Sequence, residues 1–302
     1  MNGLIQAIEL WLPDAEASLL EFGAGLYGGA GEMQTVSRTM CFGRAEGLPG
    51  LAWDEGRPVL LSDLQTGLFR RAAAARRAGL TSAVALPYFD GPAVRAVLVL
   101  FCGGDTREDG AVELWRNDPR LTGDMTLLDG HYGSTARALL ADAREAYLPR
   151  GSGLPGLAWQ RQGSVFMTGL SGSSRFLRSE AAAAAGLLHG LALPCPVPGH
   201  EHFVLTLFST PASPIARRID CWAPGARGSA PTRLHGHDEA AGELPGGAPL
   251  AADDPAAAAL ARAFASGLPQ LQPAVAGDRP NDLAVLPVSL DGSVTEAVVL
   301  RF

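Results

Sequence analysis

Short apolar runs separated by polar turns recur along the whole chain. Runs of this kind that are bounded by turn residues predict β-strands. Three of them end in tryptophan: 8–11, 112–115 and 219–222. Each is followed by a turn and a second apolar run, so each predicts an antiparallel pair of strands at the start of a longer unit.

Helical spacing and hairpin signals complete each unit. A helix is expected over Leu68–Ala78, with a counterpart that ends at Ala185, and further helices are expected after Ser134 or Thr135 and after Asp254. Two closing hairpins are marked by the turn signals Asp90-Gly91 and Asp291-Gly292. The order is β-β-(α)-loop-β-α-β-β, which predicts an α+β fold with an antiparallel sheet and packed helices.

The chain also repeats itself. Gly47–Trp53, which opens with a Gly-Leu-Pro-Gly segment predicted to be a loop, recurs residue for residue at Gly153–Trp159, and the strands on either side of it match as well. A third copy, shorter and degenerate, ends the chain. A repeat of about 100 residues is too long for a solenoid unit and indicates a series of domains. We therefore predict three consecutive modules: 1–104, 105–211 and 212–302.

Several segments of the first module form a sequence signature. They are Glu46–Trp53, Gly56-x-Pro58-Val59, Asp63-Leu64, Gly79–Pro87 and the apolar strand 97–101. This succession resembles the GAF domain family. The second module retains most of it but has Gly169 where the first has Asp63, and the third module retains only the opening strand and the closing hairpin.

GAF domains are typically small-molecule sensors or dimerisation modules of signalling proteins. The resemblance therefore implies a stand-alone sensory or regulatory protein that binds a small molecule and acts on a protein partner in trans, because no output region is recognised. The long helices that pair in GAF dimers are missing, which leaves a homodimer open. The alternative is a structural or interaction protein whose pockets are filled by its own side chains.

The GAF fold implies a pocket between the sheet of the first module and its Leu68–Ala78 helix. The side chains expected to line it are Trp53, Leu64, Phe69, Ser82 and Tyr88. Arg70 is added as an anion-binding group, because a guanidinium presents a fork to carboxylate or phosphate. Two alternatives stay open: Trp53 belongs to the core, and the arginines of the helix form a solvated face.

No enzymatic activity is expected. Free methionine sulfoxide reductases are GAF proteins with a cysteine in a Gly-x-Cys-Gly loop, and Pro49 and Pro155 occupy the corresponding position here. The cysteines are far apart in the sequence, whereas a disulfide relay needs two thiols within bridging distance. We therefore assign no catalytic residue and no cofactor.

A metal site is not expected either. His200-x-His202 and His235-x-His237 would each place two imidazoles on one face of a strand, where they could share a metal ion. The simpler interpretation is that His200 lies in an exposed turn and that His237 occupies a strand-end position that varies between the modules.

The amino-acid composition argues against several classes of partner and location. The net charge is −7 and all 24 basic residues are arginine, a usage typical of a GC-rich bacterial genome. An acidic chain lacks the basic surface that nucleic acids or anionic membranes require. We see no membrane-spanning stretch and no signal peptide, and the four scattered cysteines argue against a disulfide scaffold, so a cytoplasmic location is expected.

Overall fold

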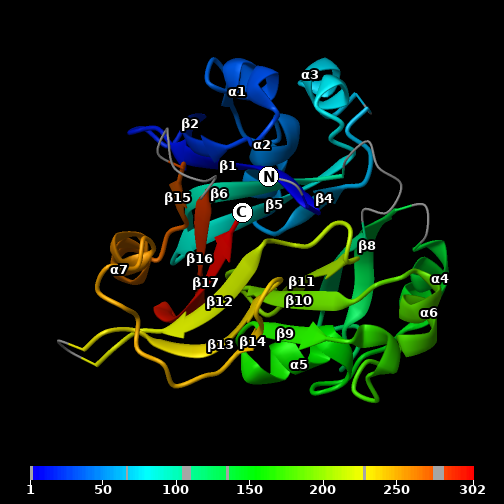
Figure 1. Ribbon diagram of the computed structural model, residues 1–302. Helices are drawn as coiled ribbons and strands as arrows, with labels where there is room; N and C mark the ends of the chain where they lie inside the picture. The colour runs from blue at the N-terminus through cyan, green and yellow to red at the C-terminus, as the bar shows by residue number, and fades with distance from the viewer. Residues whose placement is uncertain (1–2, 66, 104–109, 134–135, 227–228, 275–281) are drawn as a thin grey trace.

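Figure 1 shows the computed structural model, which describes residues 3–65, 67–103, 110–133, 136–226, 229–274 and 282–302. The strands of these residues form three antiparallel sheets. The helices lie at the periphery of the molecule, and the sheets converge toward its centre (Figure 1). The α+β fold class predicted from the sequence is confirmed.

The first sheet has six strands in the order β3-β2-β1-β6-β5-β4. The strands are β1 (Ile5–Pro13), β2 (Leu20–Leu26), β3 (Cys41–Phe42), β4 (Val59–Leu61), β5 (Ser82–Asp90) and β6 (Ala93–Cys102). The helices of this part of the chain are α1 (Gly31–Ser37), α2 (Gly47–Glu55) and α3 (Ala72–Arg77). The Asp90-Gly91 hairpin joins β5 to β6 as predicted.

The second sheet has five strands in the order β8-β7-β11-β10-β9. The strands are β7 (Ala111–Asn117), β8 (Thr126–Tyr132), β9 (Val165–Thr168), β10 (His189–Cys195) and β11 (His202–Ser209). The helices are α4 (Arg137–Glu145), α5 (Gly153–Arg161), the 3-10 helix η1 (Leu170–Gly172) and α6 (Ser179–Ala184). Ser134 and Thr135, the expected caps of α4, lie outside the described residues.

The third sheet has six strands in the order β14-β13-β12-β17-β16-β15, which is the connectivity of the first sheet. The strands are β12 (Arg218–Ala223), β13 (Thr232–Asp238), β14 (Gly242–Leu244), β15 (Gln270–Gln272), β16 (Leu283–Leu290) and β17 (Ser293–Arg301). Helix α7 (Ala257–Ser266) packs on it. The backbone N–H of Ala256 donates to the Asp254 carboxylate at 2.8 Å, but the N-cap of α7 is Ala256, so the prediction of Asp254 as the cap was wrong.

The two faces of each sheet belong to different cores. The faces that carry the helices form three separate outer cores, which bury Trp11, Trp115 and Trp222 respectively. The opposite faces meet in one shared core, to which Leu98 and Leu205, among others, contribute. Because the sheets cover one another's inner faces, the helices need to cover only the outer ones.

Of the boundaries predicted for the modules 1–104, 105–211 and 212–302, the first lies outside the described residues and the second lies between β11 and β12. The shared core nevertheless joins all three sheets, so the independence of the modules stays a prediction. At the sheet edges β4 contacts β8, and β15 contacts β2. Among the described residues, no helix combines the length and the apolar character needed to cross a membrane.

The repeated Gly-Leu-Pro-Gly segment is a helix start, and its prediction as a loop was wrong. Gly47 begins α2 with a φ of 58°, a left-handed value that favours glycine. Pro49 lies in the first helical turn, where its missing N–H is no loss because that position has no intrahelical acceptor. Gly50 packs directly against the backbone of Gly43, whose carbonyl oxygen would lie 2.0 Å from an added Cβ.

The helix expected over Leu68–Ala78 is shorter than predicted. Only Ala72–Arg77 is helical, and α6 in the second module is equally short. Before α3 the chain turns inward and buries Phe69 and Arg71, at most 3% exposed. A continuous helix would not present both of these side chains, two positions apart, to one core.

Candidate functional site

The structure separates the six residues that the sequence assigns to a ligand pocket. Trp53, Leu64 and Phe69 lie together in the outer core of the first sheet, and each is at most 4% exposed. Phe69 packs edge-on against Phe101 with ring centroids 5.9 Å apart. Trp53 therefore lies in the core, which is the alternative that the sequence analysis left open for this residue.

Ser82 and Tyr88 lie on the other face of the first sheet. Side chains alternate along β5, so that Ala83 faces the helices whereas Val84 faces the shared core. Ser82 and Tyr88 are in phase with Val84, and Tyr88 packs against the shared core. The sheet itself separates these two residues from Trp53, Leu64 and Phe69.

Arg70 is at the surface. Its side chain is 57% exposed and forms an ion pair with Glu46 at 2.8 Å. An exposed pair of this kind contributes at most about 1 kcal/mol to stability. The six residues therefore do not form one pocket, and their participation in ligand binding stays a prediction.

The neighbouring Arg71 is the arginine that enters the interior. Its Nη1 donates to Glu9 at 2.6 Å, and both side chains are at most 1% exposed. Four aromatic rings surround the guanidinium, with centroids 5.1–5.7 Å from its central carbon: Trp11, Phe42, Phe69 and Phe101. A buried cation is tolerated here because a carboxylate neutralises it and ring faces attract it.

Glu9 is the centre of this network. Its carboxylate accepts hydrogen bonds from Tyr27 at 2.9 Å, Ser37 at 2.6 Å and the indole N–H of Trp11 at 3.0 Å. Burial, followed by the charge of Glu9, raises the pKa of the Tyr27 phenol, so this hydroxyl stays a donor. The interior of the first module is thus filled by its own ion pair.

The second module contains the same arrangement. Arg178 donates to both oxygens of Glu113, at 2.6 and 2.8 Å, and Tyr132 and Trp115 donate to the same carboxylate at 2.8 Å each. The charge of Glu113 overcomes burial and raises the pKa of Arg178. The space between sheet and helices is therefore occupied here too.

The third module keeps the carboxylate but takes its arginines from strands. Asp220 accepts from Arg218 at 2.7 Å and from Arg233 at 2.9 Å. Asp220 is one methylene shorter than Glu9, and the indole N–H of Trp222 has no hydrogen-bond partner among the described residues. The segment between β15 and β16, where an equivalent of Arg71 would be expected, includes residues 275–281, which lie outside the described residues.

Sequence reasoning missed these ion pairs, although the repeat contains a signal for them. Arg71 and Arg178 are separated by 107 positions, as are Gly79 and Gly186. Glutamate precedes the strand-end tryptophan by two positions in both modules. A charge that recurs on the helix-facing side of an apolar strand needs a buried partner, and Arg71 is the arginine at the matching repeat position.

The cavity of interest lies elsewhere, where the three sheets meet. Its volume is about 420 Å³, and segments of all three modules line it. Three equivalent pairs contribute: Leu86-Pro87, Leu193-Pro194 and Leu286-Pro287. Each of these prolines is paired in register within its own sheet, opposite Val97, Val204 and Ala297 respectively.

Three polar side chains of the cavity lining, Tyr88, Cys195 and His202, are uncharged at neutral pH. Burial raises the pKa of the Cys195 thiol to about 12, and burial also raises the pKa of the neighbouring Tyr88 phenol. Burial, followed by the charge of Arg150, lowers the pKa of His202, whose ring lies 5.6 Å from that of Trp159. Of the predicted site residues, Tyr88 alone is part of this lining.

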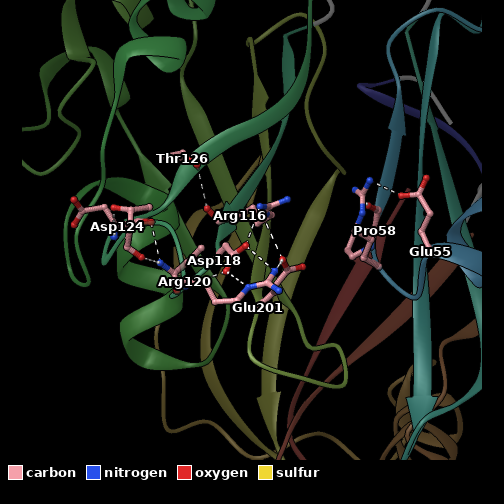
Figure 2. A network of polar contacts seen from close by, with 11 residues as sticks. Glu55, Pro58, Arg116, Asp118, Arg120, Asp124, Thr126 and Glu201 are labelled. Atoms are coloured by element: carbon pink, nitrogen blue, oxygen red, sulfur yellow. Dashed lines mark hydrogen bonds and ion pairs between the residues drawn. The ribbon is translucent and has the colours of Figure 1, made fainter.

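Two acidic residues, Glu201 and Asp291, line the cavity, and the charge of Glu201 is compensated. Glu201 lines the cavity and accepts a hydrogen bond from Arg120 at 3.2 Å. Figure 2 shows Arg120 and Arg116 bridging Glu201 to Asp118. Hydrogen bonds from Arg120 hold the pKa of Asp118 well below its usual range. A ligand in the cavity would therefore not meet an unpaired negative charge on Glu201.

The four thiols differ sharply in access. Cys41 is exposed, whereas Cys102, Cys195 and Cys221 are buried. Because the thiolate is the reactive species, burial protects the last three, and it raises the pKa of Cys221 well above its usual value. At pH 8 we expect 5,5′-dithiobis(2-nitrobenzoate) to modify Cys41 alone in the native protein. Cys41→Ser should remove that fast reaction, and a fast reaction that persists in this variant would contradict the assignment.

Comparisons with known proteins find similarity in fold over about a third of the chain. No family model matches, and no curated protein matches. The nlh2 GAF domain of A. aeolicus is 17% identical over 34% of this chain and 61% of that domain, with a TM-score of 0.27. An NreA from Staphylococcus aureus, mutated in its nitrate-binding site, is 14% identical over 33% of this chain and 76% of its own, with a TM-score of 0.27.

A third solved structure is the free methionine-R-sulfoxide reductase from Neisseria meningitidis in complex with its substrate. It is 18% identical over 33% of this chain and 51% of its own, with a TM-score of 0.25. The matched stretch thus spans less than two thirds of this enzyme and of the A. aeolicus domain. Likeness at this level of identity concerns the fold alone.

Proposed function

We propose that this chain is a small-molecule-binding regulatory protein whose ligand occupies the cavity between the three sheets. The cavity itself is the observation that supports this: it has about 420 Å³ and is lined by all three modules. Ligand sites are typically apolar hollows of roughly 300–1,000 Å³ with few polar groups, often at domain junctions. The outer cores are less suitable, because the pairs Glu9–Arg71 and Glu113–Arg178 fill two of them.

The ligand that fits this cavity is uncharged and largely apolar. Tyr88 and Cys195 keep their protons, His202 is neutral, and Glu201 is paired with arginine. Tyr88, Cys195 and His202 offer hydrogen bonds to a hydroxyl or carbonyl group but no counter-charge, and Asp291, the other acidic residue of the lining, is exposed to solvent. This ligand class differs from the acidic ligand that Arg70 suggests from the sequence.

A ligand in this position would act on the whole molecule. It would contact β5, β10 and β16 together, so its binding favours the arrangement in which the three sheets are packed. Recognition of that arrangement by a protein partner in trans completes the regulatory role. We also propose that the chain is not an enzyme, because the thiol in the cavity is protonated and Pro49 occupies the position of the reductase cysteine.

A second candidate function is a structural or interaction protein without a ligand. The observation that favours it is the pair of filled interiors, in which Arg71 and Arg178 occupy the space between sheet and helices. The two candidates differ in one measurable respect, the binding of a small molecule between the sheets.

The experiment uses the uncharged fluorescent probe N-phenyl-1-naphthylamine and two matched variants. Ser289 lines the cavity, whereas Ser293 is exposed in the same hairpin and does not line it. Ser289→Trp should fill the cavity and weaken probe binding by at least about tenfold, or about 1.4 kcal/mol. Ser293→Trp should leave it unchanged. Equal binding by both variants would place the probe elsewhere, and absence of binding to the wild type would favour the second candidate.

A further inference from the structure

Two histidines meet between the second and third sheets. His189 begins β10 and His237 lies near the end of β13, and their ring centroids are 4.5 Å apart. Both are buried, with exposures of 5% and 9%. Phe166 of β9 stacks against both rings at 5.6 and 5.2 Å and so restricts their orientation. Figure 1 shows β9 and β13 next to each other where the two sheets meet.

The polar atoms of these rings are left without hydrogen bonds. The Nδ1 atom of each ring is buried and has no partner among the described residues. The Nε2 atom of each ring lies 3.8 Å from an oxygen of Glu239, which is too far for a hydrogen bond. The Nε2 atoms of both rings therefore lie close to one carboxylate without a hydrogen bond to it.

The equivalent interface between the first and second sheets provides a contrast. There the histidine at the matching position is His131, on β8. Its Nδ1 lies 2.9 Å from the carbonyl oxygen of Ser62, and its Nε2 lies 3.4 Å from the hydroxyl of Thr81. The protein itself therefore provides partners for His131, and His237 lacks their equivalents.

We propose that His189, His237 and Glu239 bind a divalent metal ion, with Zn²⁺ as the ion that fits best. One ligand atom from each residue lies within 4.8 Å of the other two. Zinc bonds of roughly 2.0–2.2 Å place the ligand atoms of a tetrahedral site about 3.4 Å apart. The two 3.8 Å separations from Glu239 therefore need to shorten by a few tenths of an ångström, and the separation between the two imidazole nitrogens, at most 4.8 Å, needs to shorten as well; side-chain rotation supplies both changes.

The residue types also suit zinc. Two imidazoles and one carboxylate form a set of three protein ligands that leaves a fourth position open for water or an anion. A neutral imidazole has a lone pair on one of its ring nitrogens, and this is the atom that binds a metal ion. The Glu239 side chain is 27% exposed, which provides a path for the ion from solvent.

A metal in this position would connect two modules. His189 belongs to the second sheet, whereas His237 and Glu239 belong to the third, so the ion would hold β10 against β13. The three ligands are not part of the cavity lining, and the site is therefore independent of the proposed ligand. It also differs from the metal-free protein expected from the sequence, where His237 is considered only together with His235 and not with His189, which is distant from it in the sequence.

The test is calorimetric titration of the full chain with Zn²⁺ alone, at pH 7, after treatment with a chelator. One ion is expected per chain, and the melting temperature should rise by several degrees when free Zn²⁺ exceeds Kd by about a hundredfold. Co²⁺ gives a second readout, since two nitrogens and one oxygen around it produce visible absorption bands. Wild-type protein that binds neither ion would overturn the proposal.

Variants locate the site. His189→Phe keeps an aromatic ring against Phe166 but removes both nitrogens, and it should weaken Zn²⁺ binding by more than the roughly hundredfold typical of lost outer-shell partners. Glu239→Gln should also weaken binding, without altering the metal-free melting temperature. His200→Phe, in an exposed turn, is the matched control and should bind as the wild type does.

Folding of the variants does not obscure the result. Replacing a buried imidazole that lacks partners by phenylalanine removes an unsatisfied group, so metal-free His189→Phe should melt no lower than the wild type. Undiminished Zn²⁺ binding by a folded His189→Phe would overturn the proposal. Equal losses in His189→Phe and His200→Phe would do the same, because they would indicate nonspecific binding to surface histidines.

Discussion

Replacing Arg71 with Met is expected to lower the free energy of unfolding by about 3–5 kcal/mol, the range observed when one partner of a buried ion pair is removed. The Glu9 carboxylate is fully buried and would lose its counter-charge. Methionine has a suitable length to occupy the space among the aromatic rings, so the loss is electrostatic rather than a cavity effect. Urea denaturation followed by tryptophan fluorescence measures the change.

Adjacent and paired substitutions control this experiment. Arg70→Met alters the neighbouring arginine, whose ion pair with Glu46 is exposed, and should change stability by less than about 1 kcal/mol. The double variant with Glu9→Gln should recover part of the loss, because no uncompensated charge then remains. Equal effects of Arg70→Met and Arg71→Met would show that the interior pair has no special contribution.

The strands were the most predictable part of this fold. Apolar runs that end in Trp11, Trp115 and Trp222 mark the first strand of every sheet, because each tryptophan fills the core beneath the helices. The closing hairpins were predictable from Asp90-Gly91 and Asp291-Gly292, since such turns need few long-range contacts. These elements are determined by residues that are close together in the sequence.

The remainder depended on contacts between segments that are distant in the sequence. Periodicity assigned Arg70 and Arg71 to one helix and could not tell which of them enters the core; Glu9, 62 positions away from Arg71, decides this. Likewise, Ser82 and Tyr88 were grouped with Trp53 by analogy, whereas the alternation along β5 places them on the opposite face. The cavity forms from three modules, so no single stretch of sequence could indicate it.

Helix α2 was mistaken for a loop because glycine and proline are common turn signals. In the folded chain the same residues meet a steric requirement: Gly50 lies against the backbone of Gly43, and its own carbonyl accepts the N–H of Ala45 at 2.9 Å. Gly156 makes the equivalent approach to Pro149, where an added Cβ would lie 2.4 Å from the carbonyl oxygen. The repeat therefore preserves a close contact between backbones.

Gly50→Ala should consequently lower the free energy of unfolding by about 3 kcal/mol, at the upper end of the usual range for overpacking. The added methyl would lie 2.0 Å from the Gly43 oxygen, and backbone atoms cannot move aside as a flexible side chain can. Gly31→Ala is the matched control, because Gly31 is also helical, has no heavy atom within 4 Å of the added Cβ and should gain about 0.4–1 kcal/mol. Urea denaturation of both variants measures the difference, and a Gly50→Ala protein as stable as Gly31→Ala would refute the steric explanation of the repeat.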